Sequence, residues 1–215
     1  MNIILSYPRS GNHLTRFFIE ILSEKPTFGC HNSPQDIEIH KNIFLENIPF
    51  NISKNYKKED CFHKYHLPSF KENPKKLILI VRNPKEAILR HNDFKFSKIN
   101  FIDYFSSIDY YQNFTGNKKL FFYEDILQNK NNFIEELYNF LELDNEEKKR
   151  YVLDNIEDLF YQSANPIKRT WGGNNSKGKI EFYYPKLMED NKKLFDNLLS
   201  DIIEKYDFIK KKYNL

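Results

Sequence analysis

Two short apolar runs in this chain each end in a polar turn that passes directly into a helical pattern. Asn2–Ser6 is followed by the turn at 7–12 and then by apolar residues spaced three and four positions apart. Leu77–Val81 is apolar throughout, as in a central parallel strand covered on both faces, and Asn83 and Pro84 then form a helix start. Because parallel strands need crossover helices, these units predict an α/β fold of three layers, α/β/α, with a central parallel sheet.

The remaining pattern extends this architecture along the chain. The other predicted elements are strands near Cys61–Tyr65 and at Leu120–Tyr123, a helix over Phe133–Leu141, a helix opening near Asn145 with Asp144 and Glu147 as its capping box, and a long C-terminal helix with a buried face from Leu194 to Tyr206. A chain of 215 residues suits one domain of ordinary size. We therefore expect a single domain over residues 1–215.

Charge and composition exclude several classes of protein. Lys and Arg number 33 against 30 Asp and Glu, and a net charge of +3 is too small to indicate a nucleic-acid partner. No apolar run approaches the roughly 20 residues that cross a bilayer, and the N-terminus lacks the pattern of a signal peptide. Two cysteines, Cys30 and Cys61, are too few for a disulfide scaffold. We expect a cytoplasmic protein with no transmembrane segment.

The first turn, Tyr7-Pro8-Arg9-Ser10-Gly11-Asn12, has the character of a phosphate-binding loop. It lacks the Gly-Lys-[Ser/Thr] of nucleotide kinases, because Asn12 and His13 stand at the Lys and Ser/Thr positions. Consecutive backbone N–H groups at a helix N-terminus still form an anion site, with Arg9 as its cation. The hydroxyl that would hold Mg²⁺ is missing, so we expect an anion bound without a metal.

This loop resembles the 5′-phosphosulfate-binding loop of sulfotransferases that use 3′-phosphoadenosine-5′-phosphosulfate (PAPS). Three further segments match that family in order: Lys64–Pro68 resembles the segment with the catalytic histidine, Val81–Glu86 the 3′-phosphate-binding segment, and Phe122–Asp125 the Tyr-Glu-Asp stretch near the adenine. Ser176–Gly178 partly matches Arg-Lys-Gly, a second 3′-phosphate clamp. The match spans most of the chain.

The resemblance implies a P-loop NTPase-like sulfotransferase fold and in-line transfer of a sulfonate from PAPS to an acceptor hydroxyl or amine, leaving adenosine 3′,5′-bisphosphate (PAP). His66 would be the general base, and Arg9 and Lys64 would neutralise charge that develops on the bridging oxygen and the sulfonate. Backbone amides from Ser10 to His13 would hold the 5′-phosphate. The residues expected to contact the nucleotide are Arg9, Ser10, Gly11, Asn12, His13, Arg82, Arg90, Tyr123, Ser176, Lys177 and Gly178.

The chain departs from the family pattern at several positions. Arg90 stands where a phosphate-binding serine is usual, and Ser176 replaces an arginine of the second clamp, so Arg90 would compensate for the weaker clamp. Leu14 stands where an adenine-stacking tryptophan is common. Cys61, His63 and His66 could suggest a metal site, but their spacing matches no familiar zinc pattern, and we expect no metal.

Two other functions stay open. One is a P-loop small-molecule kinase that uses ATP and Mg²⁺, and the other is a non-catalytic nucleotide-binding module. The acceptor of a sulfotransferase could be a small alcohol, a phenol, a glycolipid or a saccharide. Its pocket is expected along Thr27–Tyr56, His91–Ile99 and Tyr161–Asn175.

Overall fold

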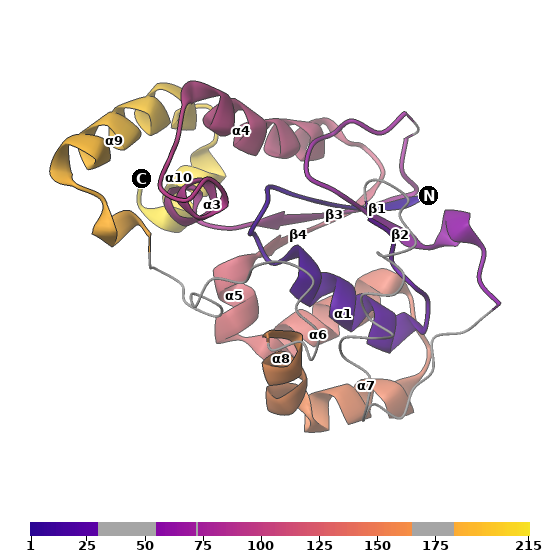
Figure 1. The fold of residues 1–215 in the computed structure, drawn as a ribbon. Coiled ribbons are helices and arrows are strands. Elements are labelled where there is room, and N and C mark those ends of the chain that lie inside the picture. The colour runs from indigo at the N-terminus through magenta and orange to yellow at the C-terminus, as the bar shows by residue number, and fades with distance from the viewer. Residues whose placement is uncertain (30–54, 72, 165–182) are drawn as a thin grey trace.

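The computed structural model describes residues 1–29, 55–71, 73–164 and 183–215. Its centre is a sheet of four parallel strands in the order β2-β1-β3-β4, which confirms the predicted fold class (Figure 1). The strands are β1 (Asn2–Ser6), β2 (Phe62–Tyr65), β3 (Lys76–Val81) and β4 (Asn117–Phe122).

Helices cover both faces of this sheet (Figure 1). One face carries α1 (Asn12–Ser23), α6 (Lys130–Leu141), α7 (Glu146–Asp154) and α8 (Ile156–Ala164). The other carries α3 (Pro84–His91), α4 (Lys98–Asn113), α9 (Glu189–Ile203) and α10 (Asp207–Tyr213). A short helix, α5 (Tyr123–Gln128), follows β4, and single 3₁₀ turns lie at Lys58–Asp60 and Tyr184–Lys186. No helix among the described residues is long and apolar enough to span a bilayer.

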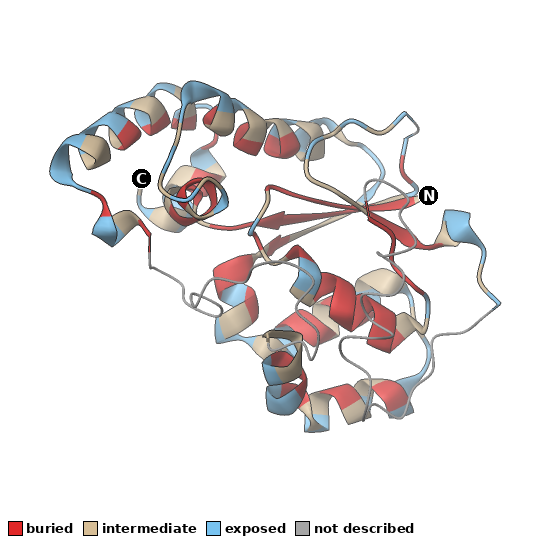
Figure 2. Ribbon diagram, in the orientation of Figure 1, coloured by how far each residue is buried: buried red, intermediate tan, exposed pale blue. Residues whose placement is uncertain are grey.

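The central strands are apolar on both sides because each side packs against a helical layer. In β1, Ile3 and Leu5 belong to the core beneath α3, α4, α9 and α10, whereas Ile4 belongs to the core beneath α1 and α6. Leu77 and Ile78 of β3 divide in the same way. Figure 2 shows the buried residues of the helices facing the sheet from both sides. Burial of two apolar faces explains why an unbroken apolar run could be recognised as a central strand.

Several predicted boundaries agree with the structure to within a residue. β1 has the predicted bounds, β3 begins one residue earlier at Lys76, and β2 begins one residue later at Phe62. The predicted helix start after β3 is also present: Pro84 occupies the first turn of α3, and the Asn83 side chain accepts a hydrogen bond from the Lys85 backbone N–H at 2.9 Å. This cap fixes the point where the chain leaves the sheet.

The predicted strand at Leu120–Tyr123 is placed wrongly at both ends. The strand begins at Asn117 and ends at Phe122, and Tyr123 is already the first residue of α5. The early part of β4 contains Lys118 and Lys119 and has no apolar pattern, because β4 is an edge strand with exposed and half-buried positions.

The capping box predicted for α7 is also corrected. Its N-cap is Asn145, whose side-chain oxygen accepts from the Lys148 backbone N–H at 3.0 Å. Asp144 lies outside the helix, and Glu147 lies in its first turn without reciprocating the cap. Asparagine and aspartate are about equal as N-caps, so sequence alone did not separate the two neighbours.

The predicted long C-terminal helix is two helices. The chain turns after Ile203, where the Tyr206 backbone N–H donates to the Ile203 carbonyl at 2.8 Å, and α10 begins at Asp207. The buried stripe of α9 is Phe195, Leu199 and Ile203, while Leu194 is 52% exposed. The break lets α10 pack back against the sheet layer instead of continuing into solvent.

Candidate functional site

The loop after β1 makes a tight left-handed turn into α1. Gly11 has φ 97° and caps α1, and Arg9 also has a left-handed φ of 68°. A Cβ atom at Gly11 would lie 2.6 Å from Cδ2 of the Tyr123 ring, closer than real contacts allow. Glycine is therefore required here both by its backbone conformation and by the tyrosine packed against it. The loop brings the N-terminus of α1, with its free backbone N–H groups, beside Tyr123.

Two buried polar atoms in this loop have no hydrogen-bond partner in the described part of the chain. Ser10 is fully buried, and its Oγ has no hydrogen-bond partner among the described residues. The Asn12 side chain donates to Ser6 Oγ at 2.9 Å, which fixes the start of α1, while Asn12 Oδ1 also lacks a partner in the described part of the chain. A buried hydroxyl without a partner is costly unless a bound group satisfies it. Its position at a helix N-terminus fits an anion such as a phosphate.

Arg82 joins this loop to Tyr123. Its side chain is 1% exposed, and its guanidinium lies 4.6 Å from the centre of the Tyr123 ring. Nη1 donates to the Arg9 carbonyl at 3.1 Å. Three segments that are far apart in sequence thus meet at the carboxyl ends of β1, β3 and β4, the edge at which parallel α/β sheets bind ligands.

Positive charge accumulates at the same place. Burial lowers the pKa of the Arg90 guanidinium, and the charges of Arg82 and Arg9 lower it further, while Tyr123 and Tyr183 act in the opposite direction. Arg90 lies in the last turn of α3, the helix that follows Arg82. The three arginines therefore repel one another, and a multiply charged anion between them would relieve that repulsion.

His66 follows β2 and contacts the last residue of β1, from which the loop at 7–12 begins. Its Nδ1 lies 2.8 Å from the Ser6 carbonyl oxygen, and its own carbonyl accepts from Ser107 Oγ of α4 at 3.3 Å. A carbonyl only accepts, so Nδ1 carries the proton and Nε2 keeps its lone pair. Burial, followed by the nearby Lys64 ammonium, lowers the pKa of His66 to about 4. His66 is therefore a neutral imidazole with a basic Nε2 at neutral pH.

Lys64 supplies positive charge close to His66, and His13 lies in the same electrostatic field. Lys64 lies in β2, and its backbone N–H donates to the Phe28 carbonyl at 2.7 Å, which adds a short parallel bridge beside the strand. The side chain of His13, in the first turn of α1, is exposed and lies in the electrostatic field of Lys64, Arg9 and His66. The loop and the end of β2 thus share one positively charged region.

The remaining residues named from the sequence either lie outside the described residues or pack within the fold. Ser176, Lys177 and Gly178 lie outside the described residues, as does most of the predicted acceptor pocket. Leu14 packs against the core beneath α1. Cys61 and His63 bond to backbone carbonyls of Lys57 and Lys58 respectively, and no group of three potential metal ligands occurs among the described residues.

Three side chains that were not assigned a site role connect the Arg82 segment to the rest of the molecule. Glu86 is fully buried and accepts the backbone N–H groups of Tyr183 and Tyr184, each at 3.0 Å. Lys85 pairs with Asp196 of α9 at 3.0 Å. Glu124 accepts the Asn83 backbone N–H at 3.0 Å. The motif spacing identified this segment, but these partners are too distant in sequence for a local pattern to reveal them.

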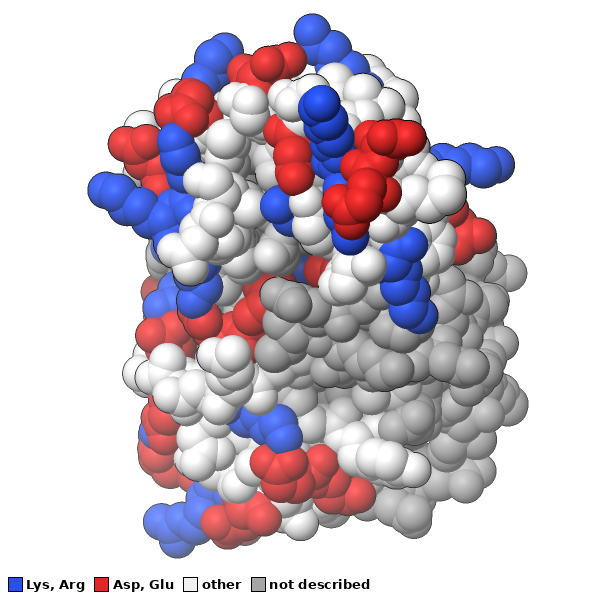
Figure 3. Space-filling view, turned by 90° about the vertical axis from the view of Figure 1, so that its left-hand side faces the viewer, with Lys and Arg blue, Asp and Glu red and all other residues white. Residues whose placement is uncertain are grey.

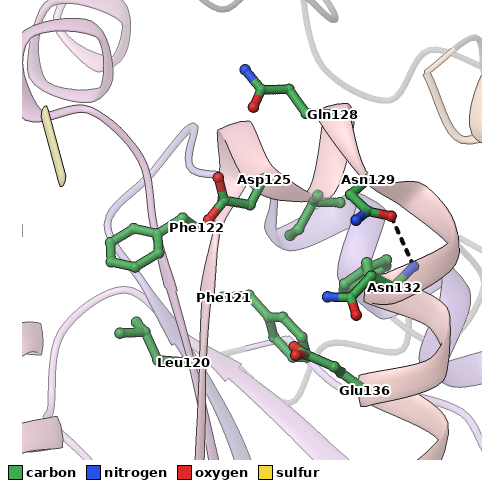
Figure 4. A pocket seen from close by; sticks show the side chains of 10 residues that line it. Leu120, Phe121, Phe122, Asp125, Gln128, Asn129, Asn132 and Glu136 are labelled. Carbon is green, nitrogen blue, oxygen red and sulfur yellow. Dashed lines mark hydrogen bonds between the residues drawn. The ribbon is translucent and has the colours of Figure 1, made fainter.

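A cavity of about 340 Å³ lies elsewhere, along the outer side of β4 between this strand, α5 and α6 (Figure 4). Its polar lining is already engaged: Asn129 caps α6 through the Asn132 N–H, Asp125 pairs with Lys212, and Glu136 pairs with Lys119. None of the predicted site residues lines it. It is not the candidate site.

The surface toward which the strands' carboxyl ends point is mixed in charge. Figure 3 views the molecule from this side, and blue and red side chains intermingle over the described part of it. Arg9, Arg82 and Arg90 therefore form a local concentration of positive charge and are not part of a uniformly basic face. Arg9 is exposed, Arg90 is half-buried and Arg82 is buried.

No protein-family model matches this chain, and no curated protein sequence matches it. Among solved structures, the fold is similar to the crystal structure of mouse sulfotransferase SULT7A1 complexed with PAP, with a TM-score of 0.59 and 17% sequence identity. The alignment covers 99% of this chain and 87% of that one. At this identity the likeness shows a sulfotransferase-type fold.

Proposed function

We propose that this protein is a sulfotransferase that moves a sulfonate from PAPS to the hydroxyl or amine of a small-molecule, saccharide or lipid acceptor. The observation that carries the proposal is the contact of His66 Nδ1 with the Ser6 carbonyl, because it places a neutral imidazole beside an anion-binding loop. The fold is similar to that of a sulfotransferase crystallised with PAP, which supports the same donor class.

The residues of the loop fit the donor nucleotide. The unpartnered Ser10 hydroxyl and the first N–H groups of α1 would hold the 5′-phosphate, with Gly11 allowing close approach. Arg82 and Arg90 would hold the 3′-phosphate, joined by Ser176, Lys177 and Gly178, and Tyr123 would lie near the adenine. PAPS supplies the sulfonate as an electrophile with PAP as its leaving group.

The catalytic roles follow from protonation states. His66 Nε2 would take the acceptor proton as the acceptor oxygen or nitrogen forms its bond to sulfur. Arg9 and Lys64 would neutralise the charge that builds on the bridging oxygen and the sulfonate as the bond from sulfur to the phosphate oxygen breaks. Burial, followed by the nearby Lys64 ammonium, keeps His66 neutral, so a base would be available before the acceptor binds.

The alternatives fit these residues less well. A kinase P-loop uses a lysine and a hydroxyl at positions that Asn12 and His13 occupy, and Asn12 is engaged with Ser6 Oγ. A non-catalytic nucleotide-binding module would have no use for a neutral imidazole held beside the loop.

The test compares nucleotides and then follows transfer. Calorimetry is expected to show binding of PAP at least tenfold tighter than ATP or AMP, because only PAP has a 3′-phosphate for the arginines. Transfer from ³⁵S-labelled PAPS to a broad acceptor panel should be detectable in the wild type. His66→Ala should lower turnover by roughly 10²–10⁴-fold with PAP affinity retained.

Three results would contradict the proposal in different ways. Phosphoryl transfer from ATP with Mg²⁺, and no response to PAPS, would favour the kinase. Tight PAP binding without transfer to any acceptor would favour the binding module. Loss of PAP affinity in His66→Ala with unchanged turnover would remove His66 from the base role.

A further inference from the structure

The peptide bond between Arg82 and Asn83 is held at both of its polar atoms by buried side chains. The Arg82 carbonyl accepts from the Tyr104 hydroxyl of α4 at 2.5 Å. The Asn83 N–H donates to Glu124 Oε1 at 3.0 Å. Tyr104 and Glu124 are 2% and 6% exposed. Rotation of this peptide would break both hydrogen bonds, so these two side chains set the direction in which the Arg82 side chain leaves the backbone.

Glu124 is in turn held by the last helix of the chain. Its second oxygen, Oε2, accepts from the Tyr213 hydroxyl at 2.7 Å. Burial raises the pKa of the Tyr213 hydroxyl, and nearby acidic groups raise it further, so Tyr213 stays a neutral donor. A carboxylate that accepts one hydrogen bond from each partner connects the N-cap of α3 directly to α10.

Two further contacts bring the end of α10 onto the residues that flank Tyr123. Lys212 pairs with Asp125 and lies 5.0 Å above the Phe122 ring. The Tyr213 ring meets the same Phe122 ring edge-on, with centroids 5.9 Å apart. The residues on both sides of Tyr123 are therefore fixed by α10, and Tyr123 is the ring over which the Arg82 guanidinium lies.

We propose that Glu124 and Tyr213 are positioning residues for nucleotide binding: through them, α10 holds the Arg82–Asn83 peptide so that Arg82 is preorganised for the 3′-phosphate. Neither side chain contacts the ligand in this role. The proposal rests on the proposed function for the identity of the ligand, PAP. The hydrogen bonds that carry it are independent of any ligand.

The test uses Tyr213→Phe and Glu124→Gln, with Tyr206→Phe as the matched control. Tyr206 also donates its hydroxyl to a carboxylate, Asp109 Oδ1 at 2.8 Å, and it lies at the other end of α10. Phenylalanine keeps each ring and removes one hydroxyl, so the two tyrosine variants differ chiefly in the bond that they lose. Glutamine at 124 retains the size of the side chain but replaces one acceptor oxygen with a donor.

We expect Tyr213→Phe and Glu124→Gln to raise the Kd for PAP by about 3- to 10-fold, the effect of a loosened buried hydrogen bond. They should raise KM for PAPS with little change in kcat. Amide hydrogen exchange in the peptide covering 82–86 should also accelerate without ligand. Tyr206→Phe should change the Kd by less than about twofold and leave exchange at 82–86 unaltered.

Failure of this proposal is separable from failure of the proposed function. If wild type binds PAP and Tyr213→Phe binds it equally well, the positioning role is overturned. Equal effects of Tyr206→Phe and Tyr213→Phe overturn it too, since they show general loosening. If wild type does not bind PAP, the proposed function fails, and exchange at 82–86 alone decides whether α10 holds this peptide.

Discussion

At the scale of single residues, the site depends on groups whose charge state is set by their surroundings. His66 has the Ser6 carbonyl on Nδ1 and the Lys64 ammonium nearby, and both the burial and this cation disfavour the imidazolium. A histidine in isolation titrates near 6.5, which would leave a fraction of it protonated at physiological pH. The lowered pKa keeps His66 neutral at physiological pH, which is the state that its proposed role as a base requires.

We predict that His66 titrates near pH 4 and shows no transition between pH 6 and 7. Because the folded protein binds this proton less tightly than the unfolded chain, the stability contributed by neutral His66 is present above pH 6.5 and is lost as the pH falls through 4. NMR of the imidazole Cε1 proton, assigned with His66→Gln, measures the midpoint directly.

Lys64→Met should raise that midpoint toward 6.5, since it removes a cation that opposes protonation. Lys58→Met is the matched control. Lys58 lies near His63 and accepts the His63 ring contact through its backbone carbonyl, so this variant should affect His63 and leave His66 unchanged. A wild-type midpoint near 6.5 would contradict the prediction.

At the scale of elements, strands and caps were predictable because their signals are local. An apolar run buried on both faces identified β1 and β3, and Asn83 followed by Pro84 identified the start of α3. The break after Ile203 was missed because its cause is long-range: α10 returns to pack at Tyr213 against Glu124. The contacts of Glu86 with Tyr183 were missed for the same reason, since no periodicity links residues so far apart.

The candidate site divides in the same way between local and long-range signals. The resemblance of four segments to the sulfotransferase family identified Arg9, His66, Arg82 and Tyr123 from the sequence, and each follows a strand. The Ser6 contact of His66 and the stacking of Arg82 on Tyr123 depend on the strand order, which single motifs do not specify.

Hydrogen bonds of Thr27 link α1 to the segment beside β2. Thr27 is fully buried, its hydroxyl accepts from Arg16 Nε at 2.7 Å, and its backbone N–H donates to Glu20 Oε1 at 2.7 Å. The Thr27 hydroxyl also donates to Glu20. The next residue, Phe28, pairs with β2 on either side of His63. The junction therefore braces the strand that ends at His66.

Thr27→Val should lower the free energy of unfolding by about 1–3 kcal/mol, because it leaves buried partners of the hydroxyl unsatisfied. Thr15→Val, in α1, is the matched control. Thr15 is also fully buried, but its Oγ1 has no hydrogen-bond partner among the described residues, so the change should be below about 0.5 kcal/mol or stabilising. Urea denaturation followed by circular dichroism measures both, and equal losses would contradict the argument.

At the scale of the whole molecule, net charge and local field are different quantities. The chain carries only +3, and acidic and basic side chains intermingle on the described part of the face shown in Figure 3. Arg9, Arg82 and Arg90 nevertheless lie within one another's fields. A ligand with two phosphate groups experiences this cluster much more than the average charge, since fields fall off within about 10 Å at ordinary ionic strength.

The affinity for PAP should therefore fall by roughly tenfold between 0.05 and 0.5 M NaCl, because salt screens the attraction between the phosphates and the arginines. Adenosine, which has the same base and sugar but no phosphate, should show little change. Arg90→Ala should weaken both the affinity and its salt dependence. Arg150→Ala, at an exposed position on α7, lowers the net charge by the same single unit and should leave both unchanged. If calorimetry shows the two arginine variants to be equivalent, overall charge governs binding and the local cluster does not.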